Sequence, residues 1–292
     1  MNHPAIPGVA PIPSTARGDS SIGGLLLESG KITPENAERV LRMQKELGIR
    51  FGEAAQRLGL ITEADIQQVL ARQFDYPYLQ PGAGDFSAEL IAAYQPFGRQ
   101  VETLRAIRSQ LMLRWFARGR KALVVVSIDP EDGASMFAAN LAVVFSQLGE
   151  QTLLVDGNLR APKQHEVFGL KMRQGLSDML AGRADMDAVA RIDSFVDLSV
   201  LGAGTLPPNP QELLSRSSFA SLNSALEARY DVVLYDVAAF TIGADALAIA
   251  ARAGGVLLVA RKNKTRLADL TVVSEQLARS GVEIVGTVLN EF

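Results

Sequence analysis

From Lys121 onward, short runs of apolar and β-branched residues alternate with segments that are long enough for a helix. Most of these runs are continuously apolar, which is typical of strands that are covered on both faces of a sheet. Strands and helices that alternate in this way form right-handed βαβ crossovers. The sequence therefore predicts an α/β domain with a doubly wound, mostly parallel sheet. The predicted strands are Ala122–Ser127, Thr152–Asp156, Leu198–Leu201, Val232–Asp236, Val256–Ala260 and Ile284–Leu289.

The chain before this sheet has a different texture. Residues 1–20 contain four prolines and several small polar residues, as disordered segments do. Apolar residues then recur at helical spacing, with Thr33 and Thr62 placed as N-caps. The predicted organisation is a disordered leader (1–20), a small helical domain (21–80), a linker (81–99) and the α/β domain (100–292), which opens with an amphipathic helix over 100–118.

Composition excludes several classes of function. The chain has no cysteine and two histidines, so thiolate catalysis, disulfides and Cys- or His-based metal centres are not expected. A net charge of −3 gives no reason to expect a nucleic-acid partner. No apolar run reaches the roughly 20 residues that a membrane-spanning helix needs. The expected location is the cytoplasm.

One segment has the position of a phosphate-binding loop. Ser127–Met136 follows a predicted strand and leads into a predicted helix from Phe137 to Leu148. A glycine-rich turn in that place points backbone N–H groups at phosphate. Such a loop also needs a lysine for the β- and γ-phosphates and a Ser or Thr for magnesium. Ser135 supplies the hydroxyl, but position 134 holds alanine.

This segment resembles the phosphate loop of the bacterial tyrosine autokinases of exopolysaccharide synthesis, which are relatives of the MinD/ParA-type ATPases. The family loop reads approximately Ser-x-x-Pro-Gly-Glu-Gly-Lys-Ser-Thr. The matching positions are Ser127, Pro130, Gly133 and Ser135, with Asp132 in place of the glutamate. The departures are Glu131 for glycine, Ala134 for lysine and Met136 for threonine.

Further motifs carry the same resemblance. Asp156–Pro162 reads Asp-Gly-Asn-Leu-Arg-Ala-Pro against the family's Asp-x-Asp-x-Arg-x-Pro, so Asn158 replaces the second acid. The family's third motif is a strand that ends in Asp, here Asp236, and Pro207–Leu214 is also close to the family pattern. The resemblance implies a nucleotide site formed by Asp132, Gly133, Ala134, Ser135, Met136, Arg160 and Asn290. It implies Ser135 and Asp156 as magnesium ligands if nucleotide binds, and Asp156, Asn158 and Asp236 as the remnants of the catalytic set.

The departures from this pattern all weaken the chemistry. Ala134 removes a positive charge, Glu131 adds a negative one, and Asn158 cannot accept a proton. The sequence does not show whether Arg160, Arg261, Lys262 or Lys264 reaches the loop to replace the lost charge. None of the five tyrosines lies beyond Tyr235, whereas these kinases phosphorylate a tyrosine-rich tail. The expected cofactor is at most weakly bound ATP or ADP with Mg²⁺.

The small helical domain contains an internal repeat. Glycine, glycine, leucine and glutamine recur at the same offsets in residues 21–44 and 50–73. The repeat resembles the N-terminal domain of type II secretion and pilus assembly ATPases, some of which bind cyclic di-GMP. That resemblance implies a candidate cyclic di-GMP site of Gly23, Gln44, Arg50, Gly52 and Gln73. The alternative is a helical adaptor whose glycines end helices.

Glu102, Arg105 and Arg108 lie one helical turn apart before the α/β domain. In the kinase family this Glu-x-x-Arg-x-x-Arg motif carries subunit contacts in a ring, so the resemblance implies a homo-oligomer. The alternative is a solvated charged stripe stabilised by i,i+3 pairs.

Three functions remain open from the sequence. The first is a non-catalytic regulatory or assembly subunit of exopolysaccharide synthesis and export, held at the inner membrane by a membrane-embedded partner. The second is a weak ATPase or tyrosine kinase that a partner completes. The third is a cyclic di-GMP receptor with the α/β domain as a scaffold.

Overall fold

The computed structural model describes residues 21–73, 79 and 84–291. The chain divides into two compact units, Met1–Tyr76 and Pro77–Phe292, each with its own core. The predicted leader, residues 1–20, lies outside the described residues.

The first unit is helical, as predicted. Thr33 accepts a hydrogen bond from the backbone N–H of Asn36 at 3.2 Å, which caps the second helix where the sequence places an N-cap. Thr62 plays the same part before the fourth helix by accepting from the N–H of Asp65 at 3.2 Å. Leu26 and Val40 are fully buried in the core of this unit. Its helices are α1 Ile22–Glu28, α2 Pro34–Leu47, α3 Phe51–Arg57 and α4 Glu63–Gln73.

The second unit is built on a seven-stranded sheet in the order β3-β4-β2-β5-β1-β6-β7. All neighbouring strands are parallel except β3, which pairs antiparallel with β4. The six predicted strands are confirmed to within a residue at each end, and the two-residue β3 carries no sequence signal. The bounds are β1 Ala122–Ser127, β2 Thr152–Asp156, β3 Ala190–Arg191, β4 Leu198–Leu201, β5 Val232–Asp236, β6 Gly255–Arg261 and β7 Glu283–Asn290.

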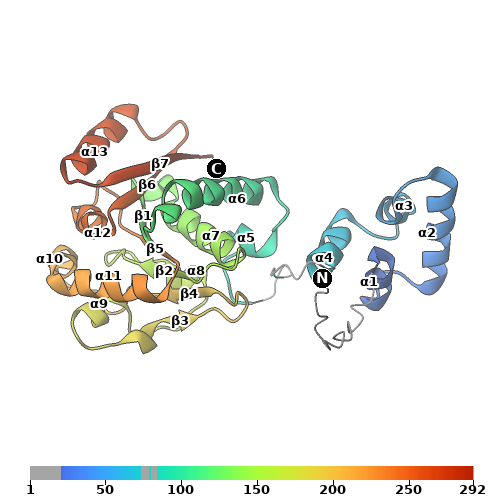
Figure 1. Ribbon diagram of the computed structural model, residues 1–292, viewed down its shortest axis with the longest axis horizontal. Coiled ribbons are helices and arrows are strands. Elements are labelled where there is room, and N and C mark those ends of the chain that lie inside the picture. The colour runs from blue at the N-terminus through green and yellow to red at the C-terminus, as the bar shows by residue number, and fades with distance from the viewer. Residues whose placement is uncertain (1–20, 74–78, 80–83, 292) are drawn as a thin grey trace, which may run out of the picture. The chain divides into compact units, whose positions relative to one another are not determined.

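Helices cover both faces of this sheet (Figure 1). Successive strand residues alternate between two hydrophobic clusters: Val125 packs with α5, α6 and α7, whereas Val124 and Val126 pack with α9 to α13. The continuously apolar strands of the sequence follow from this double cover. The helices are α5 Ile91–Tyr94, α6 Arg99–Arg114, α7 Ala134–Ser146, α8 Gln164–Val167, α9 Leu176–Leu180, α10 Pro210–Ser215, α11 Ser217–Arg229, α12 Asp245–Ala253 and α13 Leu267–Arg279, with 3₁₀ turns at Phe116–Arg118, Pro130–Asp132 and Met186–Ala188.

Residues 84–99, which the sequence assigns to the linker, pack on the α/β unit instead. Leu90 is fully buried in the cluster that covers α7. The side chain of Asn140 accepts from the N–H of Ala92 at 2.8 Å and donates to the carbonyl of Glu89 at 3.1 Å. The predicted linker extends too far for two reasons. Glycines and prolines at its start indicated a flexible segment, and α5, with four residues, is too short to show a helical period.

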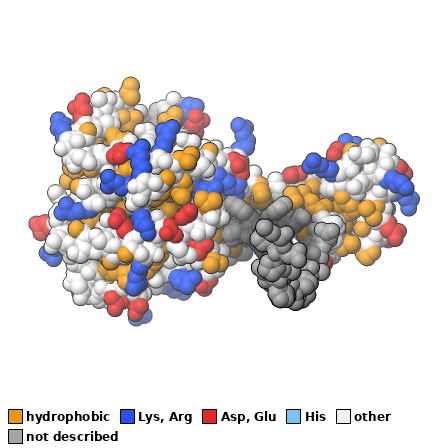
Figure 2. Space-filling model, viewed as in Figure 1, with side chains coloured by type: hydrophobic (Ala, Val, Ile, Leu, Met, Phe, Trp, Pro, Cys, Tyr) orange, Lys and Arg blue, Asp and Glu red, His pale blue; other side chains and the backbone are white. Residues whose placement is uncertain are grey.

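Charged side chains of both signs lie interspersed over the face of the α/β unit seen in Figure 2. None of the helices within the described ranges combines the length and the apolar character that crossing a membrane requires.

Candidate functional site

The loop after β1, here called the phosphate loop (residues 127–136), turns tightly into α7. Pro130–Asp132 forms one 3₁₀ turn, and Gly133 has a φ of 86°, in the left-handed region that favours glycine. The helix α7 begins at Ala134, and its first N–H groups have no acceptor within the helix. The loop therefore keeps the strand–turn–helix form that binds an anion.

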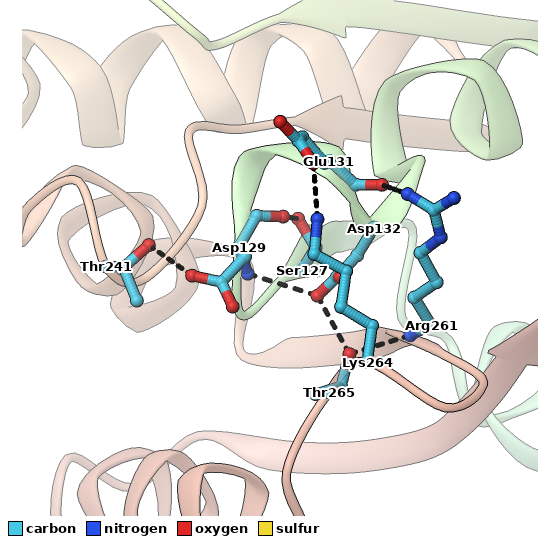
Figure 3. Close-up of polar contacts among 8 residues, drawn as sticks. All are labelled: Ser127, Asp129, Glu131, Asp132, Thr241, Arg261, Lys264 and Thr265. Atoms are coloured by element: carbon cyan, nitrogen blue, oxygen red, sulfur yellow. Dashed lines mark hydrogen bonds and ion pairs between the residues drawn. The ribbon is translucent and has the colours of Figure 1, made fainter.

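Residues 241 and 261–265 contact this loop (Figure 3), and Asn290 contacts it as well. The buried Asp132 carboxylate accepts from the N–H of Asp129 and from the hydroxyl of Thr265, both at 3.1 Å. Thr241 donates to the Asp129 carboxylate at 3.0 Å. Asn290, predicted as a nucleotide contact, donates its amide N–H to the Asp132 carbonyl at 3.1 Å. Two of the predicted nucleotide contacts, Asp132 and Asn290, thus contact each other.

Two cations reach the phosphate loop, and both contact Glu131. Lys264 forms an ion pair with the Glu131 carboxylate, and Arg261 donates to the Glu131 carbonyl at 3.2 Å (Figure 3). The hydrogen bond and charge of Lys264 lower the pKa of Glu131, so this carboxylate stays ionised. Of the charges that could stand in for the missing lysine, Lys264 is thus paired with a carboxylate of the loop and Arg261 is bonded to its backbone.

The other two candidate cations are engaged elsewhere. Arg160 makes a bidentate pair with the buried Asp245, at 2.5 and 3.1 Å. Lys262 pairs with Glu291 at 2.7 Å. Neither contact involves the phosphate loop.

Two buried aspartates lie side by side next to the loop. Asp156 ends β2 and Asp236 ends β5, in register with each other. Gly157 allows this approach, because a Cβ there would lie 2.9 Å from Ile249 and 3.0 Å from the Asp236 carbonyl. Burial, together with the neighbouring Asp156 charge, raises the pKa of Asp236 to about 7. Burial likewise raises the pKa of Asp156 to about 6, against opposing backbone hydrogen bonds.

Ser135 and Gln164 complete this cluster. The Ser135 hydroxyl donates to one Asp236 carboxylate oxygen at 3.0 Å. The Gln164 amide donates to the other at 2.7 Å and to the Ser135 carbonyl at 3.0 Å. Sequence reasoning missed Gln164, which lies at a position without a motif signal.

The remaining predicted residues have structural contacts. The Asn158 side chain accepts from the N–H groups of Arg160 and Ala161, at 3.3 and 3.1 Å, and so closes the turn after β2. Met136 packs against the core, and its carbonyl accepts from Asn140 at 3.0 Å. The Asn158 side chain thus stabilises a turn, and the Met136 side chain packs against the core.

A magnesium nucleotide fits this site poorly. The loop offers no lysine, its two nearby cations face Glu131, and the Ser135 and Asp236 oxygens already have hydrogen-bond partners. What remains for an anion is the N-terminus of α7.

The repeat of the helical unit places its glycines at two close contacts. A Cβ on Gly23 would lie 3.1 Å from the Phe51 ring, and a Cβ on Gly52 would lie 3.0 Å from Ile66. Packing between the helices therefore accounts for both glycines. Arg50 is exposed at the start of α3, Gln44 is half-buried, and Gln73 ends α4 with its side chain outside the described residues.

The charged motif of α6 is engaged within the same chain. Glu102 and Arg105 form an ion pair, with the Glu102 side chain 62% exposed. Arg108 donates to the Val144 carbonyl of α7 at 2.7 Å, so this arginine packs α6 onto the unit. Glu102 is thus the motif residue most open to a neighbouring copy.

Reversing the charge of Glu102 tests the predicted subunit contact. We expect Glu102→Arg to lower the mass measured by light scattering, because the predicted subunit contact would use the exposed Glu102 carboxylate to meet a cation of the neighbouring copy, and the variant would set two like charges against each other there. Arg114→Glu, an exposed reversal on another side of α6, is the control and should leave the mass unchanged. Equal masses for Glu102→Arg and wild type would return the motif to a solvated stripe.

Relatives of known activity class match this chain. The tyrosine-protein kinase YwqD of Bacillus subtilis is 34% identical over 201 residues, which cover 69% of this chain and 85% of YwqD. The chain belongs to the bacterial tyrosine-protein kinase family. No family model matches it. The tyrosine-protein kinase Wzc of Salmonella typhimurium is 30% identical over 203 residues, or 70% of this chain, but the chain spans only 28% of the length of Wzc.

Solved structures agree with the family assignment. The kinase domain of the Escherichia coli tyrosine kinase ETK has a TM-score of 0.66 and 28% identity, covering 69% of this chain and 79% of that one. The septum site-determining protein MinD of Pyrococcus horikoshii, complexed with Mg-ADP, has a TM-score of 0.52 and 26% identity, covering 58% of this chain and 70% of that one. Both carry the P-loop fold expected from the sequence.

Proposed function

We propose that this chain is a non-catalytic member of the family, which serves as a regulatory or assembly subunit of exopolysaccharide synthesis and export. Its expected partners are further copies of itself and a membrane-embedded component of the export machinery. It would act in the cytoplasm, held at the inner membrane by that component. In this proposal the α/β unit supplies a fold for docking rather than a catalytic centre.

The observation that carries the proposal is the altered charge of the phosphate loop, where Glu131 adds a carboxylate and the lysine is missing. Glu131 places an ionised carboxylate in the loop, and Lys264 pairs with it. Position 134 holds a buried alanine in place of lysine. Phosphoryl transfer depends on positive charge around the moving phosphate, and its loss typically slows such reactions by on the order of a thousandfold.

A second candidate is an enzyme that a partner completes. It is supported by the retained Asp156, Asp236 and Ser135, and by the free N–H groups that begin α7. An arginine or lysine donated by another protein could supply the missing charge, as arginine fingers do in other phosphoryl-transfer enzymes.

Tyrosine phosphorylation separates these two candidates. The purified chain with ATP and Mg²⁺ is expected to incorporate no phosphate on tyrosine. Incorporation above background that is abolished by Asp156→Ala would overturn the non-catalytic proposal. Incorporation that needs an added membrane partner, and is equally abolished by Asp156→Ala, would favour the completed enzyme.

For the helical unit, cyclic di-GMP binding stays a prediction. It depends chiefly on Arg50, the exposed arginine that opens the second repeat. Arg50→Ala should weaken binding about 10- to 100-fold, since a hydrogen bond to a charged group contributes about 1.5–3 kcal/mol. A flat calorimetric titration of wild type with cyclic di-GMP would leave residues 21–73 as a protein-docking module.

A further inference from the structure

Gln164 is the least expected residue of the acidic cluster. It is the first residue of α8, and its side chain is completely buried. The two hydrogens of its amide nitrogen serve the Asp236 carboxylate at 2.7 Å and the Ser135 carbonyl at 3.0 Å. Its own oxygen, Oε1, has no hydrogen-bond partner among the described residues.

The unpaired oxygen indicates why an amide is present. A buried acceptor without a partner destabilises the fold, so packing alone would favour an apolar side chain of the same size. The donated hydrogens offset that penalty, because a buried carboxylate also needs donors. The hydrogen bonds that Nε2 donates to Asp236 and Ser135 therefore explain why a glutamine stands at this buried position.

One atom that Gln164 engages, a carboxylate oxygen of Asp236, belongs to the set that would hold a divalent cation, and its other partner is the backbone carbonyl of Ser135, whose hydroxyl belongs to that set. In a P-loop the serine hydroxyl binds Mg²⁺, and hard cations prefer carboxylate and hydroxyl oxygens. Here the Ser135 hydroxyl donates to Asp236, and Asp156 accepts from the N–H groups of Lys163 and Gln164, each at 2.9 Å. Each of these side chains already has a partner within the chain.

We propose that the Gln164 amide is a built-in substitute for the divalent cation. One amide hydrogen goes to the Asp236 carboxylate oxygen that a metal ion would otherwise bind, and the other holds the Ser135 backbone carbonyl, so that Ser135 and Asp236 keep their places without metal. This inference rests on the proposed function, because both describe a site that works without Mg²⁺ and nucleotide. It adds a second and separate block: restoring the phosphate loop alone would leave the cation excluded.

Binding of Mn²⁺ alone, without nucleotide, tests the proposal in the full-length chain. Wild type is expected to bind Mn²⁺ weakly or not at all by calorimetry and by the electron paramagnetic resonance signal of the free ion. Gln164→Ala vacates the position, and Gln164→Glu places a carboxylate there. Each should bind at least tenfold more tightly than wild type. Glu166→Ala, on the exposed side of α8, is the matched control and should behave as wild type.

Adding Asp236→Asn to either Gln164 variant should abolish the gain, which assigns the ion to this cluster. Circular dichroism shows whether each Gln164 variant has folded. If one of the two has not, Mn²⁺ binding by the other tests the proposal. If neither folded Gln164 variant binds Mn²⁺ more tightly than wild type, the proposal is wrong. Tyrosine phosphorylation by wild type would overturn the non-catalytic function by a different readout, so the two failures are distinguishable.

Discussion

Asp236→Asn is expected to raise the free energy of unfolding at pH 8 by on the order of 2–4 kcal/mol. Burial raises the pKa of Asp236 to about 7. Between about pH 4 and pH 7 the folded state therefore holds a proton that the unfolded state has lost, and stability falls as the pH rises through this window. Asparagine has no charge to bury.

Urea unfolding at pH 5 and pH 8 measures this effect. The difference between variant and wild type should be small at pH 5 and should grow toward pH 8. Asp193→Asn, which changes an exposed aspartate, is the control and should track wild type at both values. A difference between Asp236→Asn and wild type that does not change with pH would mean that the Asp236 carboxylate is not held protonated in the fold.

Restoring the phosphate loop should give the largest gain in nucleotide binding. In the double variant Ala134→Lys with Glu131→Gly, the new lysine adds a phosphate donor, and the loss of Glu131 frees Lys264 from its ion pair. A hydrogen bond to a charged group contributes about 1.5–3 kcal/mol, so affinity for ATP should rise about 10- to 100-fold.

The single variants show which defect dominates. Glu131→Gly alone should give a smaller gain, because it frees Lys264 without supplying the missing charge of the loop. Asp193→Asn again serves as a control that leaves the loop untouched. An affinity of the double variant equal to that of wild type, measured by calorimetry with ATP, would show that lost charge is not what prevents binding.

The sheet was predictable because burial on both faces leaves a plain mark in the sequence. Val232–Leu234 of β5 are buried and all apolar, and the length of this apolar run and the turn that follows the strand indicate its bounds. Residues 84–99 were assigned to the linker because their order comes from Asn140 and Gln147 of another helix. Contacts of that kind have no local period that a sequence could reveal.

The candidate site was predictable only as a set of positions. The motifs placed Ser135, Asp156 and Asp236 together, as the structure has them. They did not reveal that Lys264 faces Glu131 or that Gln164 fills the cluster, because both contacts join segments that are far apart in the chain. Those two contacts now carry the case for a site that works without Mg²⁺ and nucleotide.

Calorimetric titration of the wild-type chain with ATP and Mg²⁺ tests that case most directly. Because the loop lacks its lysine and carries Glu131, we expect little or no heat of binding, with a dissociation constant on the order of millimolar. The double variant Ala134→Lys with Glu131→Gly, titrated under the same conditions, should bind about 10- to 100-fold more tightly than wild type. A micromolar dissociation constant for wild type that rises with Asp156→Ala would contradict the account, because it would mean that Glu131 and Gln164 yield to the nucleotide and its cation.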